Sequence, residues 1–281
     1  MSDWSHARAP SGQRFVFRES GDGPVVVFLH GFPDTPHGWD RIAAAVAAAG
    51  YRTMRPWLRG YHPETLVAGR GYDPMTTAHD PVDLLDALGV DRAVLVGHDW
   101  GAAITYAASS VAPDRFRAIV PIAIPHPSLL PRDPGTLWAA RHFAGFKMPW
   151  AEAMTRRNDF GYLDTLYTRW APNWTGPQRD ESLRNVKECF REPTSLTGAL
   201  AYYRALSPKV PRELARPAPV RALVVGGSDV IVAAELFTKT AQRMADGSES
   251  FVIERAGHWP HREAEDDCIA KLIRFLAATP D

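Results

Sequence analysis

Cysteine, charge of one sign and long hydrophobic runs are all scarce in this chain. The 281 residues include only two cysteines, Cys189 and Cys268, which cannot build a disulfide framework and lack metal-ligand spacing. This scarcity is typical of a reduced, cytoplasmic setting. Basic and acidic residues balance at 32 each, and no block of five or more like charges occurs. The sequence therefore predicts no nucleic-acid partner.

Segments that would enter or cross a membrane are also missing. The strongly apolar run at residues 25–29 has five residues, whereas a membrane-spanning helix needs about 20. Residues 1–10 are polar and lack the apolar core of a signal peptide. We therefore expect no membrane partner. The hydrophobic fraction of 45% instead favours a globular protein with a sizeable core.

Short apolar runs alternate with amphipathic segments toward both ends of the chain. The predicted strands are residues 25–29, 51–55, 93–96, 118–124, 220–225 and 250–254. The predicted helices are residues 42–49, 80–88, 100–111, 233–244 and 264–278. This alternation is typical of an α/β fold in which helices flank a mostly parallel central sheet.

The middle of the chain breaks this alternation. Residues 126–216 are helical in character, interrupted by prolines and rich in Trp and Tyr. The simplest interpretation is a helical cap (lid) inserted into one sheet domain, whose core is formed by residues 1–125 and 217–281. Such a cap would lie over the carboxyl ends of the strands, where α/β sheets bind their ligands.

The motif Gly97-His98-Asp99-Trp100-Gly101 joins a predicted strand to a predicted helix. A G-x-nucleophile-x-G motif in that context is typical of a nucleophile elbow, a sharp turn that raises its central side chain above the sheet edge. Asp99 occupies the centre, and a carboxylate can displace a leaving group at a saturated carbon to form an ester. The alternative is that Asp99 only caps the helix that follows it.

A second motif, His-Gly-Phe-Pro at residues 30–33, directly follows the predicted strand 25–29. In hydrolases of this fold, such a turn supplies one backbone N–H of the oxyanion hole, and the residue after the nucleophile supplies the other. The expected donors are therefore Phe32 and Trp100. We expect His30 to be a structural histidine bonded to the backbone.

A third motif, Ala-Gly-His-Trp-Pro at residues 256–260, lies between the last predicted strand and helix. The chain order nucleophile, acid, histidine places the general base there, which indicates His258. Asp229 follows the strand 220–225 and is the candidate acid that orients His258, although Gly-Gly-Ser-Asp is also good surface-turn chemistry. His261 is a competing base that we expect to face solvent.

Together these motifs resemble the epoxide hydrolase branch of the α/β-hydrolase superfamily, over nearly the whole chain except the predicted cap. The resemblance implies an enzyme that adds water to an epoxide to give a vicinal diol. Asp99 would form an alkyl ester with the epoxide, and water activated by His258 would then hydrolyse it. We expect neither a cofactor nor a metal.

In this family two cap tyrosines usually donate hydrogen bonds to the oxirane oxygen. Tyr203 matches one of them, unless it is only a packing aromatic of the cap. Residues 138–146, where the other is expected, contain no tyrosine, which departs from the family pattern. His142 is the nearest side chain able to donate there, and Tyr162 and Tyr167 are alternatives.

Two other functions stay open. A haloalkane or haloacid dehalogenase would share Asp99 and His258 and could use the Trp100 indole N–H to bind halide. Those enzymes usually place Asn, Glu or Trp at the position of Phe32, which cannot donate. A hydrolase fold kept as a non-catalytic binding protein is the third hypothesis, although pure binding needs none of this arrangement.

The tryptophans of the predicted cap are Trp138, Trp150, Trp170 and Trp174. They favour an apolar substrate, or else they join the cap to the core. The sequence specifies neither the particular epoxide nor its enantiomer. A homodimer is kept as an alternative to a monomer.

Overall fold

A single eight-stranded sheet forms the centre of the computed structural model, which describes residues 4–67, 69, 71–130, 141–207, 209–229 and 232–280. The strands are β1 (Ser5–Arg8), β2 (Arg14–Ser20), β3 (Val25–Leu29), β4 (Arg52–Pro56), β5 (Ala93–His98), β6 (Phe116–Ile122), β7 (Leu223–Gly227) and β8 (Glu249–Ile253). Their order is β1-β2-β4-β3-β5-β6-β7-β8, antiparallel in the first two pairings and parallel in the rest. The predicted α/β architecture is confirmed, while β1 and β2 were not predicted.

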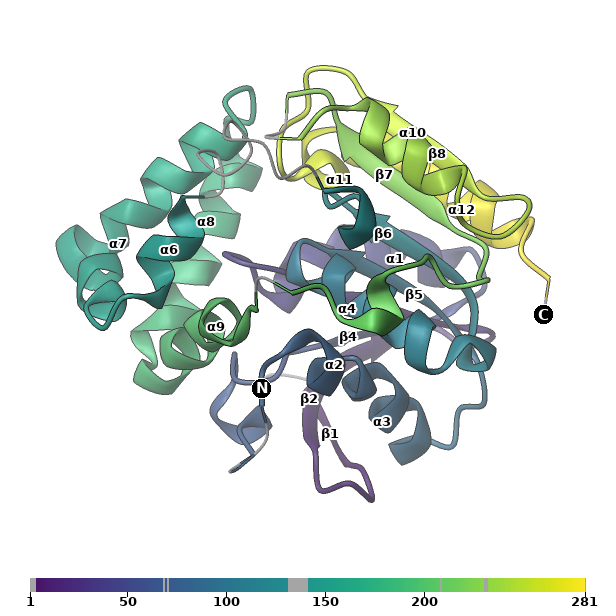
Figure 1. Ribbon diagram of the computed structural model, residues 1–281, viewed down its shortest axis with the longest axis horizontal. Helices are drawn as coiled ribbons and strands as arrows, with labels where there is room; N and C mark the ends of the chain where they lie inside the picture. Colours follow the sequence, from purple (N-terminus) through teal and green to yellow (C-terminus); the bar gives the residue numbers. More distant parts are fainter. Residues whose placement is uncertain are drawn as a thin grey trace.

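Helices cover both faces of the sheet (Figure 1). They are α1 (Asp40–Ala48), α2 (Pro74–Thr77), α3 (His79–Ala87), α4 (Trp100–Val111), α10 (Glu235–Ala241), α11 (Pro260–Glu263) and α12 (Glu265–Ala277). Short 3-10 turns occur at η1 (Pro36–Trp39), η2 (Pro63–Thr65), η3 (Pro113–Arg115), η4 (Pro127–Leu129) and η5 (Arg212–Leu214). None of the described helices is long and apolar enough to cross a membrane.

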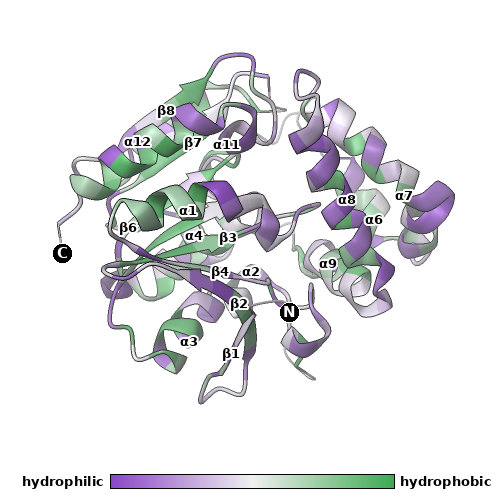
Figure 2. Cartoon of the chain, turned by 180° about the vertical axis from the view of Figure 1, so that it is seen from behind, coloured by the Kyte–Doolittle hydropathy of each residue, from purple (hydrophilic) through white to green (hydrophobic). Residues whose placement is uncertain are grey.

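The alternation of side chains along β3 explains why both faces need cover. Val25, Val27 and Leu29 pack in the hydrophobic cluster that also contains buried residues of α3, α4 and α10. Val26 and Phe28 point the other way, into a second cluster formed with α1 and α12. A strand that is buried on both faces appears in the sequence as a continuous apolar run, and residues 25–29 form such a run. Figure 2 shows hydrophobic residues gathered on the strands and on the helices that cover them.

In the described part of the segment between β6 and β7, four α-helices stand apart from these layers, beyond one end of the sheet (Figure 1). They are α6 (His142–Lys147), α7 (Ala151–Trp170), α8 (Pro177–Arg191) and α9 (Pro193–Ala205), and non-helical dihedrals interrupt α7 at residues 157–160. We call these four helices the cap. They contact loops that follow β3, β4 and β8, since Tyr167 donates to the Pro33 carbonyl and Tyr202 donates to that of Arg59. The exact limits of the cap domain stay a prediction.

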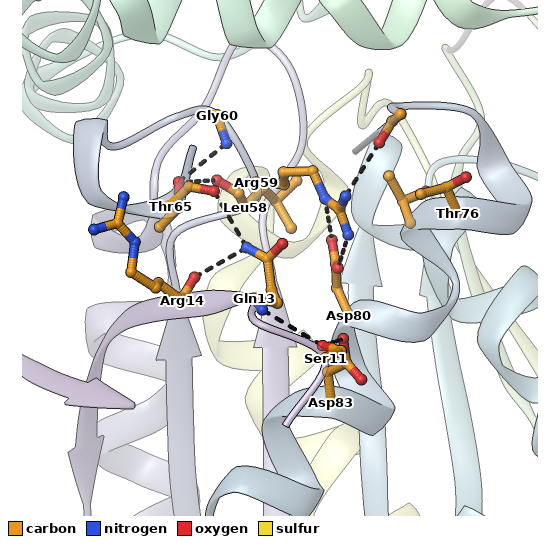
Figure 3. A network of polar contacts seen from close by, with 12 residues as sticks. Ser11, Gln13, Arg14, Leu58, Arg59, Gly60, Thr65, Thr76, Asp80 and Asp83 are labelled. Carbon is orange, nitrogen blue, oxygen red and sulfur yellow. Dashed lines mark hydrogen bonds and ion pairs between the residues drawn. The ribbon is translucent and has the colours of Figure 1, made fainter. Parts of the chain in front are cut away.

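A polar network fixes the loop after β4, on which α9 rests (Figure 3). The guanidinium of Arg59 forms an ion pair with Asp80 and donates to the Gly71 carbonyl at 3.2 Å. Thr65 Oγ1 accepts a hydrogen bond from Gly60 N–H at 3.0 Å, and its own carbonyl accepts one from Gln13. This network is buried, so its hydrogen bonds satisfy polar groups that water cannot reach. It therefore holds the loop in one position for the cap to contact.

The cap and this loop meet backbone to backbone at two glycines. A Cβ atom on Gly198 of α9 would lie 2.2 Å from the Gly60 carbonyl oxygen, a distance that real Cβ atoms do not adopt. Even alanine at position 198 must therefore push α9 away from the core. Glycine is required here because of the close approach and not because of helix propensity, which it lowers.

We predict that Gly198→Ala destabilises the protein by about 1–3 kcal/mol, the usual cost of overpacking a close contact. Urea unfolding measures this change in the free energy of unfolding. Gly145→Ala is the matched control, because Gly145 also lies in a cap helix but its Cβ would meet no atom within 4 Å. That control should be neutral or stabilising by up to about 1 kcal/mol. Equal effects of the two substitutions would contradict the role of the close approach.

Candidate active site

Asp99 occupies the sharp turn between β5 and α4. Its φ of 52° and ψ of −113° lie in a region that non-glycine residues rarely adopt. A Cβ on Gly101 would lie 2.3 Å from the Leu29 carbonyl oxygen, so the turn can pack against β3 only with glycine there. The side chain of Asp99 makes no capping hydrogen bond to α4. The alternative of a simple helix cap is therefore wrong, and the predicted elbow geometry is present.

Two groups approach the Asp99 carboxylate from opposite sides. The backbone N–H of Phe32 donates to Oδ1 at 2.8 Å, and His258 Nε2 lies 3.4 Å from Oδ2. The first is a good hydrogen bond, and the second is an ion-pair distance slightly longer than one. A Cβ on Gly31 would lie 2.4 Å from the Asp99 Cβ, so this glycine makes room for the carboxylate beside the Phe32 amide.

The surroundings of Asp99 keep it ionised at neutral pH. Burial alone would raise the pKa of this carboxyl group. The neighbouring His258 imidazole and the Phe32 N–H outweigh burial, so the pKa of Asp99 is lowered from its usual value. The side chains of Asp99 and His258 each keep 14% of their surface accessible, so a water-sized molecule can reach both.

Backbone hydrogen bonds hold His258 in place. Its N–H donates to the Trp170 carbonyl of the cap at 2.7 Å, and its carbonyl accepts from His98 Nε2 at 2.7 Å. The flanking amides of Gly257 and Trp259 both donate to Glu263. Sequence reasoning missed Glu263 and the structural use of His98. An acidic residue a few positions after the histidine was the only available signal.

Asp229 lies on the loop after β7, as predicted, but it is not bonded to His258. It is exposed, and its carboxylate accepts from the Ser228 hydroxyl at 2.8 Å and from the Asn173 amide at 3.0 Å. The expected orienting contact is therefore absent from the described structure. The physical reason is that Asn173, from the segment after α7, joins Asp229 to the Arg255 carbonyl at 2.8 Å and holds the carboxylate there.

Tyr203 of α9 lies above the elbow in an aromatic cluster. Its ring centroid is 5.2 Å from that of Phe32 and 5.0 Å from that of Trp100. Burial and the nearby Asp99 charge raise the pKa of Tyr203 well above its usual value, so its hydroxyl keeps its proton. Tyr203 therefore lies near Asp99, and its role as a donor stays a prediction.

The structure separates the candidates for the second cap donor. His142 is buried in the same aromatic cluster, 6.3 Å from the Tyr203 ring and 4.8 Å from that of Trp170. Tyr167 instead donates to the Pro33 carbonyl at 3.0 Å, which makes it a fastening between cap and core. Tyr162 is half-buried and contacts Phe146, and burial raises its pKa.

Two further histidines, His30 and His261, were also assigned from the sequence. The expectation for His30 is confirmed, and the expectation for His261 is wrong. Leu58 N–H donates to His30 Nε2, and Nδ1 lies 3.1 Å from the Gly31 carbonyl, so His30 is structural as expected. His261 was expected to face solvent, but it is 1% exposed and stacks on Trp39 with ring centroids 4.5 Å apart. The prediction failed because α11 is only one turn long and turns this side chain inward beneath the sheet edge.

The cap tryptophans mostly join the cap to the core. Trp170 lies 5.1 Å from the His258 ring, and Trp174 lies 5.6 Å from that of Trp259. Trp150 is 61% exposed and lines nothing near Asp99, while Trp138 lies outside the described residues. Two small pockets adjoin the sheet elsewhere and do not touch Asp99.

Comparison with known proteins agrees with this geometry. Residues 26–271 match the model of the alpha/beta hydrolase family. The chain belongs to this family. It is 32% identical to an epoxide hydrolase of Caballeronia sordidicola across 95% of this chain and 92% of that protein. It is 30% identical to the AB hydrolase superfamily protein YfhM of Bacillus subtilis (strain 168), across 91% of each.

A solved structure resembles this chain along nearly the whole length of both proteins. The crystal structure of an epoxide hydrolase from Vigna radiata superposes with a TM-score of 0.79 and 26% sequence identity, and the match covers 98% of each chain. The predicted resemblance to the epoxide hydrolases of the α/β-hydrolase superfamily is thereby confirmed.

The ionised state of Asp99 has a consequence for the pH dependence of stability. A carboxyl group whose pKa is lower in the folded state stabilises the fold above its unfolded pKa, and this stabilisation is lost as pH falls. We predict that Asp99→Asn reduces the free energy of unfolding more at pH 7 than at pH 3, measured by urea unfolding at both values. A deficit that grows toward pH 3 would contradict the assignment of a lowered pKa.

Proposed function

We propose that this protein is an epoxide hydrolase that converts a small apolar epoxide and water to a vicinal diol through an ester on Asp99. The observation that carries this proposal is the ionised Asp99 carboxylate between the Phe32 amide and His258, with Tyr203 above it. The epoxide hydrolases of Caballeronia sordidicola and Vigna radiata support the same substrate class. We expect it to act without a cofactor.

In the first step, Asp99 attacks one carbon of the oxirane. A C–O bond to the carboxylate forms as the ring C–O bond breaks, and the negative charge moves to the former ring oxygen. Tyr203 is the group that donates a hydrogen bond and then a proton to this oxygen, because its hydroxyl stays protonated beside Asp99. His142 is our second donor, on the strength of its place in the same cluster.

In the second step, water hydrolyses the ester. His258 takes a proton from the water, which adds to the ester carbonyl derived from Asp99. The N–H groups of Phe32 and Trp100 stabilise the resulting oxyanion. Phe32 already donates to this oxygen, and Trp100 is the first residue of α4, whose N–H has no acceptor within its helix. Collapse of the intermediate breaks the ester C–O bond. The leaving oxygen takes the proton of the hydroxyl group added from water, which releases the diol and restores the Asp99 carboxylate, and His258 returns its proton to Tyr203.

The acid that supports the imidazolium of His258 is a separate part of the proposal. We retain Asp229 for this role once substrate is bound, which requires it to leave Asn173. Glu263 is the alternative, because its carboxylate accepts from the amides on both sides of His258 and lies close enough to that residue to interact with it electrostatically.

A dehalogenase is the second candidate function, and one observation favours it. The indole Nε1 of Trp100 is buried and has no hydrogen-bond partner among the described residues, so it could bind a halide ion. Phe32, the residue that faces it across the elbow, offers no side-chain donor. We therefore rank epoxide opening first. A binding protein without turnover is ranked last.

The proposed cytoplasmic setting agrees with the state of the cysteines. Cys189 and Cys268 are both free thiols, and burial raises the pKa of each to about 12. Neither is therefore poised to react.

Trapping the ester tests the proposal directly. His258→Gln should slow ester hydrolysis by about 100- to 10,000-fold while Asp99 can still attack. Intact and peptide mass spectrometry after addition of styrene oxide should show the whole epoxide mass on the peptide that contains Asp99. An adduct formed only from a haloalkane, with halide released, would support the dehalogenase. A folded variant that forms no adduct with either class would support a binding role.

Tyr203→Phe tests the proton donor. We predict that it slows ester formation by at least about 100-fold and leaves ester hydrolysis nearly unchanged, as separated by single-turnover kinetics. Tyr202→Phe is the matched control, since the Tyr202 hydroxyl is already engaged in donating to the Arg59 carbonyl. Equal slowing of both steps by Tyr203→Phe would show that the residue only supports the structure.

A further inference from the structure

Behind His258, one buried carboxylate and two buried imidazoles converge, and both imidazoles have ring nitrogens without a hydrogen-bond partner among the described residues. Asp34 follows β3, His98 ends β5, and His261 lies in α11. Their exposed fractions are 3%, 0% and 1%. In the part of the chain that the structure describes, one oxygen of Asp34 and one nitrogen from each histidine lie within 4.8 Å of one another. None of these residues has a step in the proposed reaction.

The hydrogen bonding of His98 fixes which of its nitrogens faces the cluster. Nε2 lies 2.7 Å from the His258 carbonyl oxygen, which can only accept, so Nε2 carries the proton. Nδ1 therefore presents a lone pair, and it has no hydrogen-bond partner. It lies 3.9 Å from Asp34 Oδ2. A buried lone pair that faces a carboxylate oxygen is repulsive unless a cation or a proton lies between them.

The remaining groups of the cluster point to the same deficiency. Asp34 Oδ1 accepts from the Thr35 amide at 2.8 Å, which leaves Oδ2 for another partner. Both ring nitrogens of His261 lack a hydrogen-bond partner, although its ring is fixed between Trp39 and His98 at centroid distances of 4.5 and 4.6 Å. A buried neutral imidazole normally satisfies at least its N–H, so this arrangement is exceptional.

We propose that Asp34 Oδ2, His98 Nδ1 and a ring nitrogen of His261 bind a divalent transition-metal ion of the Zn²⁺ class. Two imidazoles and one carboxylate are ligands that such ions prefer, and water can complete the coordination. The donation of His98 Nε2–H to a backbone carbonyl is the usual way in which a metal-bound histidine is oriented. The atoms must close by about 1 Å to reach coordination distances near 2.1 Å.

The charges around the cluster are compatible with such an ion. Arg262 is the nearby cation, but it lies 3.3 Å from Glu265 and donates to the Gly38 carbonyl, so other groups share its charge. Burial lowers the pKa of both histidines, which keeps them in the neutral form that binds metal. His261 and Lys271 also line a small pocket beside the sheet.

The predicted consequence is a firmer position for His258. His98 would be coordinated through Nδ1 while Nε2–H holds the His258 carbonyl, so the ion would anchor the loop that carries the proposed base. The site itself does not depend on any chemistry at Asp99, and it can be tested by binding alone.

The experiment measures metal content in variants of the full chain. Chelator-treated protein is dialysed against limiting Zn²⁺, both in the native state and after refolding from urea with Zn²⁺ present, and bound zinc is measured by elemental mass spectrometry. His261→Phe removes both ring nitrogens but keeps a flat ring on Trp39, and Asp34→Asn removes the charge. His6→Ala, at an exposed histidine, and His258→Gln are the controls.

We expect about one zinc per chain in the unaltered protein and in both controls, and below about 0.1 in His261→Phe and Asp34→Asn, whichever loading route is used. Co²⁺ in place of Zn²⁺ should give visible absorption bands that disappear in the same two variants. Zinc that persists in His261→Phe, or that is lost in His258→Gln, would overturn the proposal in favour of surface binding or of binding at Asp99. No uptake by either loading route would overturn it as well.

Discussion

The placement of one ionised carboxylate constrains most of this structure. Asp99 is held in a strained backbone conformation at the end of β5, and its charge is balanced by the Phe32 amide and His258. Asp99 and these two partners come from three distant parts of the chain, and they meet only because parallel strands end at one edge of the sheet. The buried sheet core supplies the stability that offsets the strain of the turn. Rigidity of the fold and reactivity of the site are thus two results of the same arrangement.

The sequence was sufficient for features with a local cause. The run at residues 25–29 had to be a doubly buried strand, and the spacing of glycines around Asp99 required a sharp turn between strand and helix. His258 could be placed because the order of motifs along the chain fixes its loop. Strand β7 begins at Leu223, whereas the sequence predicted a start at residue 220. The start of a strand is decided by its pairing, here with β6 and β8, and hydrophobicity alone does not show it. The antiparallel strands β1 and β2 were missed because their alternation is short and partly polar.

The parts that could not be predicted depend on contacts between distant segments. Nothing near Asp229 in sequence indicates that Asn173 would bind its carboxylate, and nothing near His261 indicates that it would stack on Trp39. The cluster of Asp34, His98 and His261 escaped notice for the same reason, because its members are separated by more than sixty residues each. Spacing rules for metal ligands detect neighbours in sequence, and a sheet edge brings together residues that are neighbours only in space.

The bond from the His258 amide to the Trp170 carbonyl also limits how the enzyme can admit and release molecules. The cap is tied to the very loop that carries the proposed base, so lifting the cap as a rigid body would pull that loop out of place. We therefore expect substrate and product to enter and leave by rotation of individual aromatic side chains. These small local movements would replace the hinge motion of a whole lid. The size of the substrates that can enter then depends on the bulk of a few aromatic rings. Substituting one of these aromatic residues is the simplest way to change which substrates enter.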